Sequence, residues 1–194
     1  KKYAKDIDKV KLTEILGGGD EKAVYSFVAE YFGVKSDEVA ESASQYVDYD
    51  HFKGIRISTR PDCIDDEICH ILKENKVTAV ELGAQSMCDD VLFANERGHT
   101  ADDVIKASKL ITSYGFELGL QMMTGLYGDS RDTALETAGK LIALAPDTAR
   151  IYPTVVFEGT KLYEQCLNGE YVPITNEEAV ERFLLYFLPF LRFR

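Results

Sequence analysis

Residues 80–100 of the chain read VELGAQSMCDDVLFANERGHT. The apolar start predicts a buried strand, and Thr100-Ala101-Asp102-Asp103 resembles a capping box with which a helix begins. Polar residues gather between them, around a Gly-Ala-Gln-Ser turn and a Glu-Arg-Gly-His segment: Gln85, Ser86, Glu96, Arg97 and His99. A strand that only built a core would not need them, so we interpret this stretch as a strand that ends at a binding site.

The segments on both sides of this stretch alternate between strand and helix patterns. Runs rich in β-forming residues are GIRIS (54–58), VTAVEL (77–82), FELGLQMM (116–123) and ARIYPTVV (149–156). Helical patterns follow them at residues 65–75, around 104–111, and at 131–144, 160–167 and 176–187. Strands separated by helices of this length indicate βαβ units and a parallel α/β sheet. An open doubly wound sheet and part of a (β/α) barrel both satisfy right-handed crossovers.

Polar residues recur at the ends of all four predicted strands. They are Ser58-Thr59-Arg60, Gln85-Ser86, the segment from Gln121 to Gly125, and Tyr152-Pro153-Thr154. In both fold types, ligands bind at the carboxyl ends of the strands. The repetition at four successive ends therefore predicts one site built from several loops.

The residues of this site each leave two interpretations open. Gln85 carries amide donors and an acceptor, which suit a ribose or an amino-acid group but also a loop backbone. Arg97 suits a ligand carboxylate, or an ion pair with Glu96 or Asp89. For His99 we expect a hydrogen bond that holds the loop rather than a metal, because no second ligand has suitable spacing.

Three further features each have a structural interpretation. The spacing of Gly125-Leu126-Tyr127-Gly128 matches neither a Walker loop nor the dinucleotide fingerprint, so we expect a tight strand-to-helix turn. Arg60-Pro61-Asp62 forms either a charged part of the site at the end of a strand or a turn closed by its own Arg–Asp pair. Met122 and Met123 pack against an adenine or a substrate, or fill a gap in the core as methionine commonly does.

The two ends of the chain carry weaker patterns. VKLTEIL (10–16) could form another strand that runs into a glycine-rich turn, and residues 21–47 are interpreted as two polar helices. The run FLLYFLPFLRFR at the end predicts an amphipathic core helix, with a lipid or partner contact as the alternative. Since the chain starts without methionine and stops within an apolar run, we interpret it as an internal piece of a longer protein. We divide it into residues 1–53, a core at 54–187 and a tail at 188–194.

Composition limits the class of protein. The 194 residues, 45% hydrophobic and 28% charged, are ordinary for a globular chain long enough to bury its own core. A net charge of −11 argues against a nucleic-acid surface that extends over the whole chain. Four scattered cysteines form neither a disulfide framework nor a zinc site, which favours a reducing, cytoplasmic location. No leader pattern and no apolar run of about 20 residues is present, so we expect no membrane partner.

Taken together, several motifs resemble one family. They are GIRISTRPDCID, VELGAQSMCDDVLFANERGHT, FELGLQMMTGLYGD, PDTARIYPTVVFEGTKLYE and NGEYVPIT. In this order and spacing they resemble the radical S-adenosylmethionine (SAM) enzymes, in particular the group around the catalytic subunit of Elongator. The resemblance runs from about Gly54 to Glu181.

The resemblance implies a partial TIM-type (β/α) barrel that holds SAM and a [4Fe–4S] cluster. Such enzymes cleave SAM with one electron to give a 5′-deoxyadenosyl radical, which abstracts hydrogen from a substrate. By motif position, Ser58, Gln85 and Gln121 would line the ribose and methionine groups of SAM, and Arg97 would bind its carboxylate. The substrate implied is the wobble uridine of tRNA, contacted through regions outside this chain. No catalytic residue is assigned.

Two departures from the family pattern matter. The cluster-binding cysteine motif is absent, and the four cysteines cannot replace it by spacing. Its ligands are therefore expected upstream of residue 1, so no metal ligand is assigned here and the chain alone is expected neither to hold the cluster nor to cleave SAM. Gln121 stands where many Elongator-type members have histidine, and no acetyltransferase domain is recognised.

Two other functions remain open. One keeps the radical chemistry with another substrate, as in relatives of oxygen-independent coproporphyrinogen oxidase. The other is a cluster-free barrel remnant that serves as a binding module. A cysteine motif upstream of Lys1 would distinguish an enzyme from such a remnant.

Overall fold

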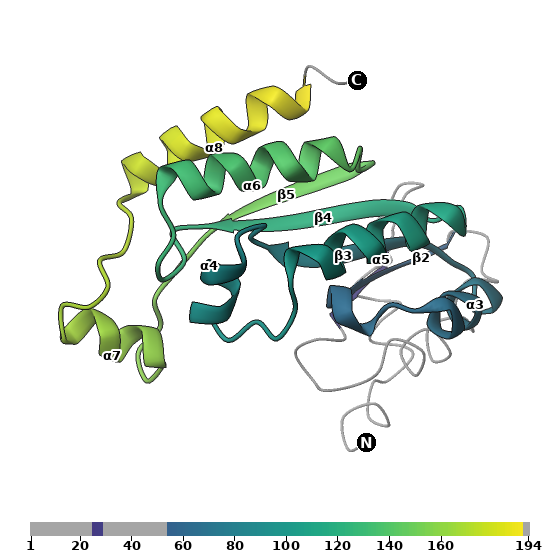
Figure 1. Ribbon diagram of the computed structural model, residues 1–194, viewed down its shortest axis with the longest axis horizontal. Helices are drawn as coiled ribbons and strands as arrows, with labels where there is room; N and C mark the ends of the chain where they lie inside the picture. The colour runs from purple at the N-terminus through teal and green to yellow at the C-terminus, as the bar shows by residue number, and fades with distance from the viewer. Residues whose placement is uncertain (1–24, 29–53, 192–194) are drawn as a thin grey trace, which may run out of the picture.

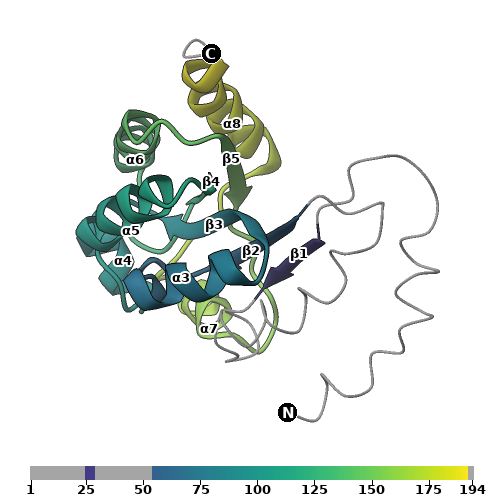
Figure 2. The same ribbon diagram turned by 90° about the vertical axis from the view of Figure 1, so that its right-hand side faces the viewer.

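The computed structural model describes residues 25–28 and 54–191, with side chains for residues 54–186. Five parallel strands form one sheet in the order β1-β2-β3-β4-β5 (Figure 1 and Figure 2). They are β1 (Tyr25–Val28), β2 (Ile55–Thr59), β3 (Val77–Gln85), β4 (Glu117–Thr124) and β5 (Thr148–Pro153). The four strands predicted from the sequence correspond to β2 through β5, so the parallel α/β sheet is confirmed.

Helices follow the strands as the sequence pattern predicts. They are the short 3₁₀ helix η2 (Pro61–Cys63), α3 (Asp66–Glu74), α4 (Asp89–Ala94), α5 (Ala101–Ser113), α6 (Arg131–Ala143), α7 (Lys161–Leu167) and α8 (Asn176–Leu191). The capping box predicted at Thr100 is confirmed, and Ser130 forms a second one at the start of α6. Helix α8 continues past Pro189, which removes one hydrogen bond in its last turn without ending the helix. Within residues 54–191, no helix combines the length and the apolar character that membrane crossing requires.

The strand β1 corrects one prediction for the N-terminal region. Residues 25–28 read YSFV and pair in parallel with β2, where the sequence was interpreted as polar helix. Tyrosine, phenylalanine and valine favour strands, and a partner strand decides the conformation of so short a segment. The segment VKLTEIL and residues 29–53 lie outside the described residues.

The strand order identifies the sheet as part of a (β/α) barrel. Every strand neighbours the next one in sequence, whereas the strand order of a doubly wound sheet reverses at a switch point. Helices α3, α5 and α6 pack against β3 and β4, and Figure 1 shows them along one side of the sheet. The hydrophobic core lies between these helices and the sheet, where Ile57, Leu82, Ile111, Leu120 and Leu141 are at most 1% exposed.

Candidate functional site at the strand ends

The sheet face opposite the helices is polar, and we call it the inner face. Along β3, Val80, Leu82 and Ala84 belong to the helix-side core, so the alternation of a strand directs Glu81 and Gly83 to the inner face. The register of the parallel pairs extends this face across the sheet to Arg56, Ser58, Glu117, Gly119, Gln121, Thr148 and Arg150. Two arginines and two glutamates therefore share one face of a sheet whose other face is apolar.

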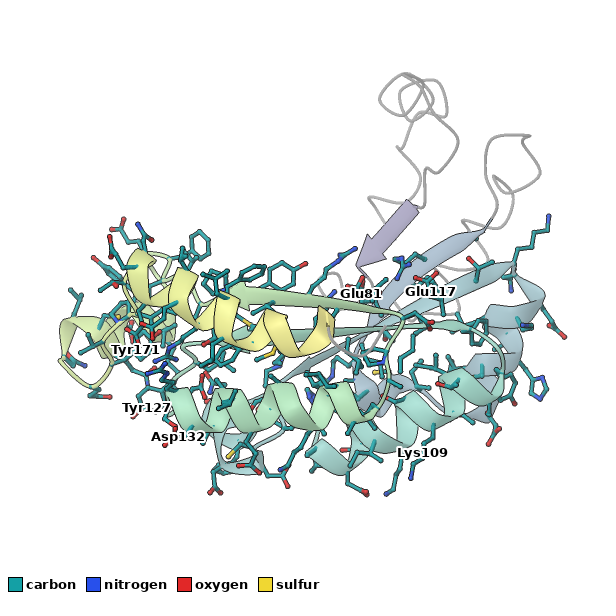
Figure 3. The ribbon with its side chains drawn as sticks, turned by 90° about the horizontal axis from the view of Figure 1, so that it is seen from above. Glu81, Lys109, Glu117, Tyr127, Asp132 and Tyr171 are labelled. Carbon is teal, nitrogen blue, oxygen red and sulfur yellow. The ribbon has the colours of Figure 1, made fainter. Side chains whose placement is uncertain are left out.

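An ion pair closes the inner face at the amino ends of the strands. Arg56, near the start of β2, pairs with Glu117 at the start of β4 and donates from Nη1 to Thr148 Oγ1 at 3.3 Å. In Figure 3, Glu81 and Glu117 lie close together at the sheet, away from Lys109 and Asp132 on the helices. These contacts join β2, β4 and β5 at their amino ends, so a ligand of the inner face would enter from the carboxyl ends.

Nearer to the carboxyl ends of the strands than this ion pair, a buried carboxylate links three strands. Glu81 Oε1 on β3 lies 3.0 Å from Arg150 Nε on β5, and Ser58 Oγ on β2 donates to Glu81 Oε2 at 3.4 Å. Gly119 on β4 lies between them, and a Cβ there would come within 2.9 Å of Glu81 Cγ. A glycine in the middle strand therefore leaves the space through which Glu81 reaches Arg150.

Of the four predicted SAM-binding residues, the structure brings Ser58 and Gln121 together on the inner face. Ser58 is 6% exposed and pairs in register with Glu81. Gln121 is half-buried and is the register partner of both Gly83 and Arg150.

The third predicted residue, Gln85, has an unusual backbone and an unused oxygen. It is the last residue of β3, and its φ of 62° lies in the left-handed region that side chains other than glycine rarely adopt. The side chain is 6% exposed, and its Oε1 atom has no hydrogen-bond partner among the described residues. A strained backbone that buries an unused acceptor destabilises the fold, which is the pattern expected of a ligand contact.

The fourth predicted residue, Arg97, lies in the loop between α4 and α5. His99 Nε2 contacts Ala84 O at 3.1 Å, which holds this loop against the end of β3. The φ of Gly98 is +74°, and a Cβ there would lie 2.8 Å from Arg60 Nη2. The half-buried Arg97 is thus carried by a loop that His99 holds against the end of β3 and that passes close to Arg60 after β2, and the structural role expected for His99 is confirmed.

Several residues at the strand ends are structural. Ser86 Oγ contacts Thr137 Oγ1 of α6 at 3.3 Å. Ser86 therefore helps to attach α6 to the sheet and is not part of the polar cluster predicted at the binding site. Arg60 Nε donates to Asp62 Oδ1 at 2.9 Å, which is the self-closed turn expected as one interpretation. Met122 is 1% exposed within the core, again as one of its two interpretations predicts.

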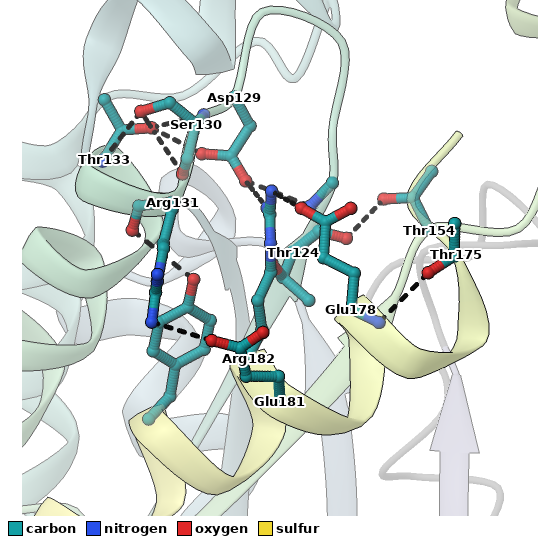
Figure 4. A network of polar contacts seen from close by, with 12 residues as sticks. Thr124, Asp129, Ser130, Arg131, Thr133, Thr154, Thr175, Glu178, Glu181 and Arg182 are labelled. Atoms are coloured by element: carbon teal, nitrogen blue, oxygen red, sulfur yellow. Dashed lines mark hydrogen bonds and ion pairs between the residues drawn. The ribbon is translucent and has the colours of Figure 1, made fainter. Parts of the chain in front are cut away.

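A second polar cluster fixes α8 to the end of β4 (Figure 4). Arg182 on α8 is 8% exposed, donates to Thr124 Oγ1 at 3.2 Å and pairs with Glu178. Its Nη1 atom also lies 4.0 Å from Asp129 Oδ2, which in turn accepts a hydrogen bond from the Gly125 backbone N–H at 3.0 Å. The tight turn predicted after β4 is therefore present and is tied to α8.

A pocket of about 280 Å³ lies beside this cluster, between the turn after β4 and the start of α8. The Tyr171 hydroxyl donates to Gly125 O, and burial raises the pKa of Tyr171 above its ordinary value. Tyr171 and Tyr127 lie together at this end of the molecule in Figure 3. Since Tyr171 stays protonated, it supports the turn as a hydrogen-bond donor.

The cysteines do not form a metal site. All four lie in the described residues as free thiols, and no group of three or more histidine, cysteine or acidic side chains suited to a metal ion occurs there. Cys69 is fully buried, and burial, followed by the charges of Asp66 and Asp65, raises its pKa to about 11. The described residues therefore fit the polar groups of SAM, through Gln85 above all, but they do not fit a [4Fe–4S] cluster.

Glu81, Arg150 and Arg182 were missed in the sequence. For Glu81 a signal existed, because a single carboxylate interrupts the apolar run VTAVELGA and a buried charge requires a partner. Nothing local to the sequence identifies Arg150 as that partner. Arg182 lies in an ordinary helical pattern with Glu178 four residues before it, which is typical of an exposed ion pair.

Comparisons with known proteins agree with this architecture. Residues 1–141 match the Radical SAM superfamily, and residues 146–192 match the Radical_SAM C-terminal domain. These matches include the first 53 residues and α8, both of which extend beyond the resemblance found between Gly54 and Glu181. The division into residues 1–53, 54–187 and 188–194 stays a prediction.

The chain is also similar to proteins of known name. It is 39% identical over 129 residues to the tRNA uridine(34) acetyltransferase of Methanocaldococcus infernus, which covers 64% of this chain and 24% of that protein. It is 33% identical over 182 residues to the protein of the same name from Dehalococcoides mccartyi (87% and 39% covered). It is 31% identical over 196 residues to human Elongator complex protein 3 (93% and 35% covered). The chain thus spans well under half the length of these relatives.

Solved structures share the fold. The archaeal Elp3 of M. infernus with its N-terminus (1–46) deleted superposes with a TM-score of 0.72 at 25% identity, over 91% of this chain and 47% of that one. Methylornithine synthase gives 0.68 at 16% identity, over 95% and 53%, which shows the fold alone. The resemblance to the Elongator group is confirmed by these relatives. The family match and the shared barrel architecture together establish that the chain belongs to the radical SAM superfamily.

Proposed function

We propose that the chain is the SAM-binding partial barrel of an enzyme that modifies uridine 34 of tRNA. Support comes from relatives that are 31–39% identical and are named tRNA uridine(34) acetyltransferase or Elongator complex protein 3. The alternative of a coproporphyrinogen-oxidase-like substrate rests on a likeness of the fold at 13% identity, which carries no information about substrate. The acidic net charge means that contacts with the phosphate backbone of the RNA belong to other parts of the parent protein.

The observation that carries this proposal is the buried, unpartnered oxygen of Gln85 on a strained backbone. Gln85 would bind a hydroxyl or ammonium donor of SAM. Ser58 and Gln121 would hydrogen-bond the ribose and methionine groups from the inner face, and Arg97 would pair with the carboxylate. When bound, SAM and the cluster of the parent protein would supply radical chemistry. The residues of this chain orient SAM and keep water away from it.

The cluster requires thiolates that the described residues, which include all four cysteines, do not arrange. Cys69 is protonated at neutral pH, and the four cysteines form no metal-binding group within the described residues. We therefore assign the cluster ligands to a part of the parent protein outside this chain. Four free cysteines are compatible with a reducing compartment such as the cytoplasm.

The substitution Gln85→Gly separates binding from folding. Glycine accepts the left-handed backbone without strain, and this relief offsets the packing that the amide side chain provides. In the reconstituted parent enzyme, we expect an about tenfold weaker SAM affinity, the effect of one hydrogen bond. We expect a melting temperature that is equal or higher.

The matched control is Lys76→Gly, at the opposite end of β3. Lys76 has a φ of 61° and is exposed, so its replacement relieves a similar strain away from the site. We expect a higher melting temperature and unchanged SAM affinity, both measured by equilibrium dialysis and thermal unfolding. Unchanged SAM affinity in Gln85→Gly would leave Gln85 without a ligand and would overturn the assignment.

A further inference from the structure

Arg150 presents an unused guanidinium edge on the inner face. Its side chain is 43% exposed, whereas that of its partner Glu81 is 0% exposed. Within the described residues, Arg150 is placed by an ion pair in which its Nε atom lies 3.0 Å from Glu81 Oε1, although the two atoms are not aligned for a hydrogen bond. A guanidinium has five N–H donors in a planar fork, so four remain on the two Nη atoms.

The ion pair between Glu81 and Arg150, which we call the bridge, has structural costs that an ion pair serving only to join two strands would not need. Burying a carboxylate is costly, and Gly119 must lack a side chain for Glu81 to reach across β4. The ion pair of Arg56 and Glu117 already joins the strands at their amino ends. What the bridge adds is one fixed orientation of Arg150 beside Gln121, its register partner.

The charge of Arg150 is compensated, and this decides the chemistry of its ligand. Because Glu81 supplies a buried negative charge 3.0 Å from Nε, an anion would gain little at this position. A neutral acceptor such as a ring carbonyl would still accept hydrogen bonds from the Nη atoms. The arrangement therefore favours a planar, carbonyl-bearing ring over a phosphate.

We propose that Arg150, held by Glu81 across Gly119, recognises the target base by donating to a carbonyl oxygen of uracil. This inference rests on the proposed tRNA function, and it names a specificity-determining residue within it. Uracil presents the O4 acceptor where cytosine presents an N4 amino donor. A fixed donor therefore forms a hydrogen bond with uracil and is repelled by the amino group of cytosine. Bases on which an enzyme acts are turned out of their stack and are recognised by such edge contacts.

The test compares two anticodon stem–loop RNAs, with uridine or cytidine at the target position. Binding to the full-length parent protein is measured with SAM present, by fluorescence anisotropy. We expect the parent protein to prefer the uridine RNA by about tenfold, the discrimination expected of one or two hydrogen bonds. The variant Arg150→Gln should bind both RNAs equally, because an amide can donate to uracil or accept from cytosine.

Arg56→Gln is the matched control, since it removes the same charge from the same face, and it should keep the preference. Arg150→Lys keeps the charge but loses the planar fork, so it should reduce the preference even where Arg150→Gln does not fold. A preference for uridine that survives both Arg150 substitutions overturns the inference. Equal binding of both RNAs by the parent also overturns it but leaves the proposed function standing. A parent that binds neither RNA overturns both.

Discussion

Adding one methyl group at Gly119 should destabilise the fold through a defined clash. An ideal Cβ at this position would lie 2.9 Å from Glu81 Cγ, 3.1 Å from Glu81 Cβ and 3.1 Å from Thr148 Oγ1. Overpacking of this kind costs about 1–3 kcal/mol. The lower backbone entropy of unfolded alanine offsets about 0.4–1 kcal/mol. For Gly119→Ala we therefore expect a net loss of about 1–2 kcal/mol, measured by urea unfolding of the chain.

Gly139 provides the opposite case within the same molecule. It lies in α6, and a Cβ there would meet nothing within 4 Å. In a helix, alanine is about 0.8–1 kcal/mol more favourable than glycine, so Gly139→Ala should raise the stability. The two glycine substitutions should thus shift the urea midpoint in opposite directions.

A double-mutant cycle identifies the clashing partner. In a Glu81→Ala background the Cγ atom is gone while the contacts with Cβ and Thr148 remain, so Gly119→Ala should lose part of its effect, with a coupling energy of about 1 kcal/mol. The same loss in both backgrounds would mean that Glu81 is not what the methyl group meets. A Gly119→Ala chain as stable as the unmodified one would refute the argument that the glycine makes room for the bridge.

Three other predictions test the remaining contacts. The 194-residue chain, reconstituted with iron and sulfide without oxygen, should hold no stoichiometric [4Fe–4S] cluster, and about four irons per chain would contradict this. Arg182→Met should cost about 3 kcal/mol, because it leaves the buried Asp129 carboxylate without its nearby cation. Arg131→Met at an exposed ion pair should cost at most about 1 kcal/mol, and equal losses in urea unfolding would disprove the difference. Thr100→Ala should cost about 1 kcal/mol at pH 7 through the lost helix cap. Hydrogen bonds from Thr100 lower the pKa of Asp103, so this difference should shrink as the pH falls below about 4, and a constant difference would exclude that coupling.

The fold was predictable where periodic patterns were long. The apolar run of β3 and the capped helix α5 are recognisable from the sequence alone, and the order of strands and helices follows from them. The strand β1 was not predictable, because four residues carry too little pattern and the partner strand decides their conformation.

The site was predictable only in part. Gln85 and Arg97 could be selected from the sequence, because they are polar residues that follow a buried strand. The partners of Ser86 and Glu81 are side chains on α6 and β5, far away in sequence, and no local pattern identifies them. Sequence therefore predicts where a strand ends, and the fold decides which polar residue remains available to a ligand.

The contact between Arg182 and Thr124 also bears on the order in which the chain is completed during synthesis. The two residues are 58 positions apart, and α8 is the last of the described elements. Since a ribosome releases the amino-terminal part first, β2 to β5 can pair before Arg182 has left the ribosome. Until α8 arrives, the Asp129 carboxylate and the end of β4 remain hydrated. A nascent chain halted before α8 should therefore carry a sheet whose carboxyl edge is still open to proteases at Gly125–Gly128.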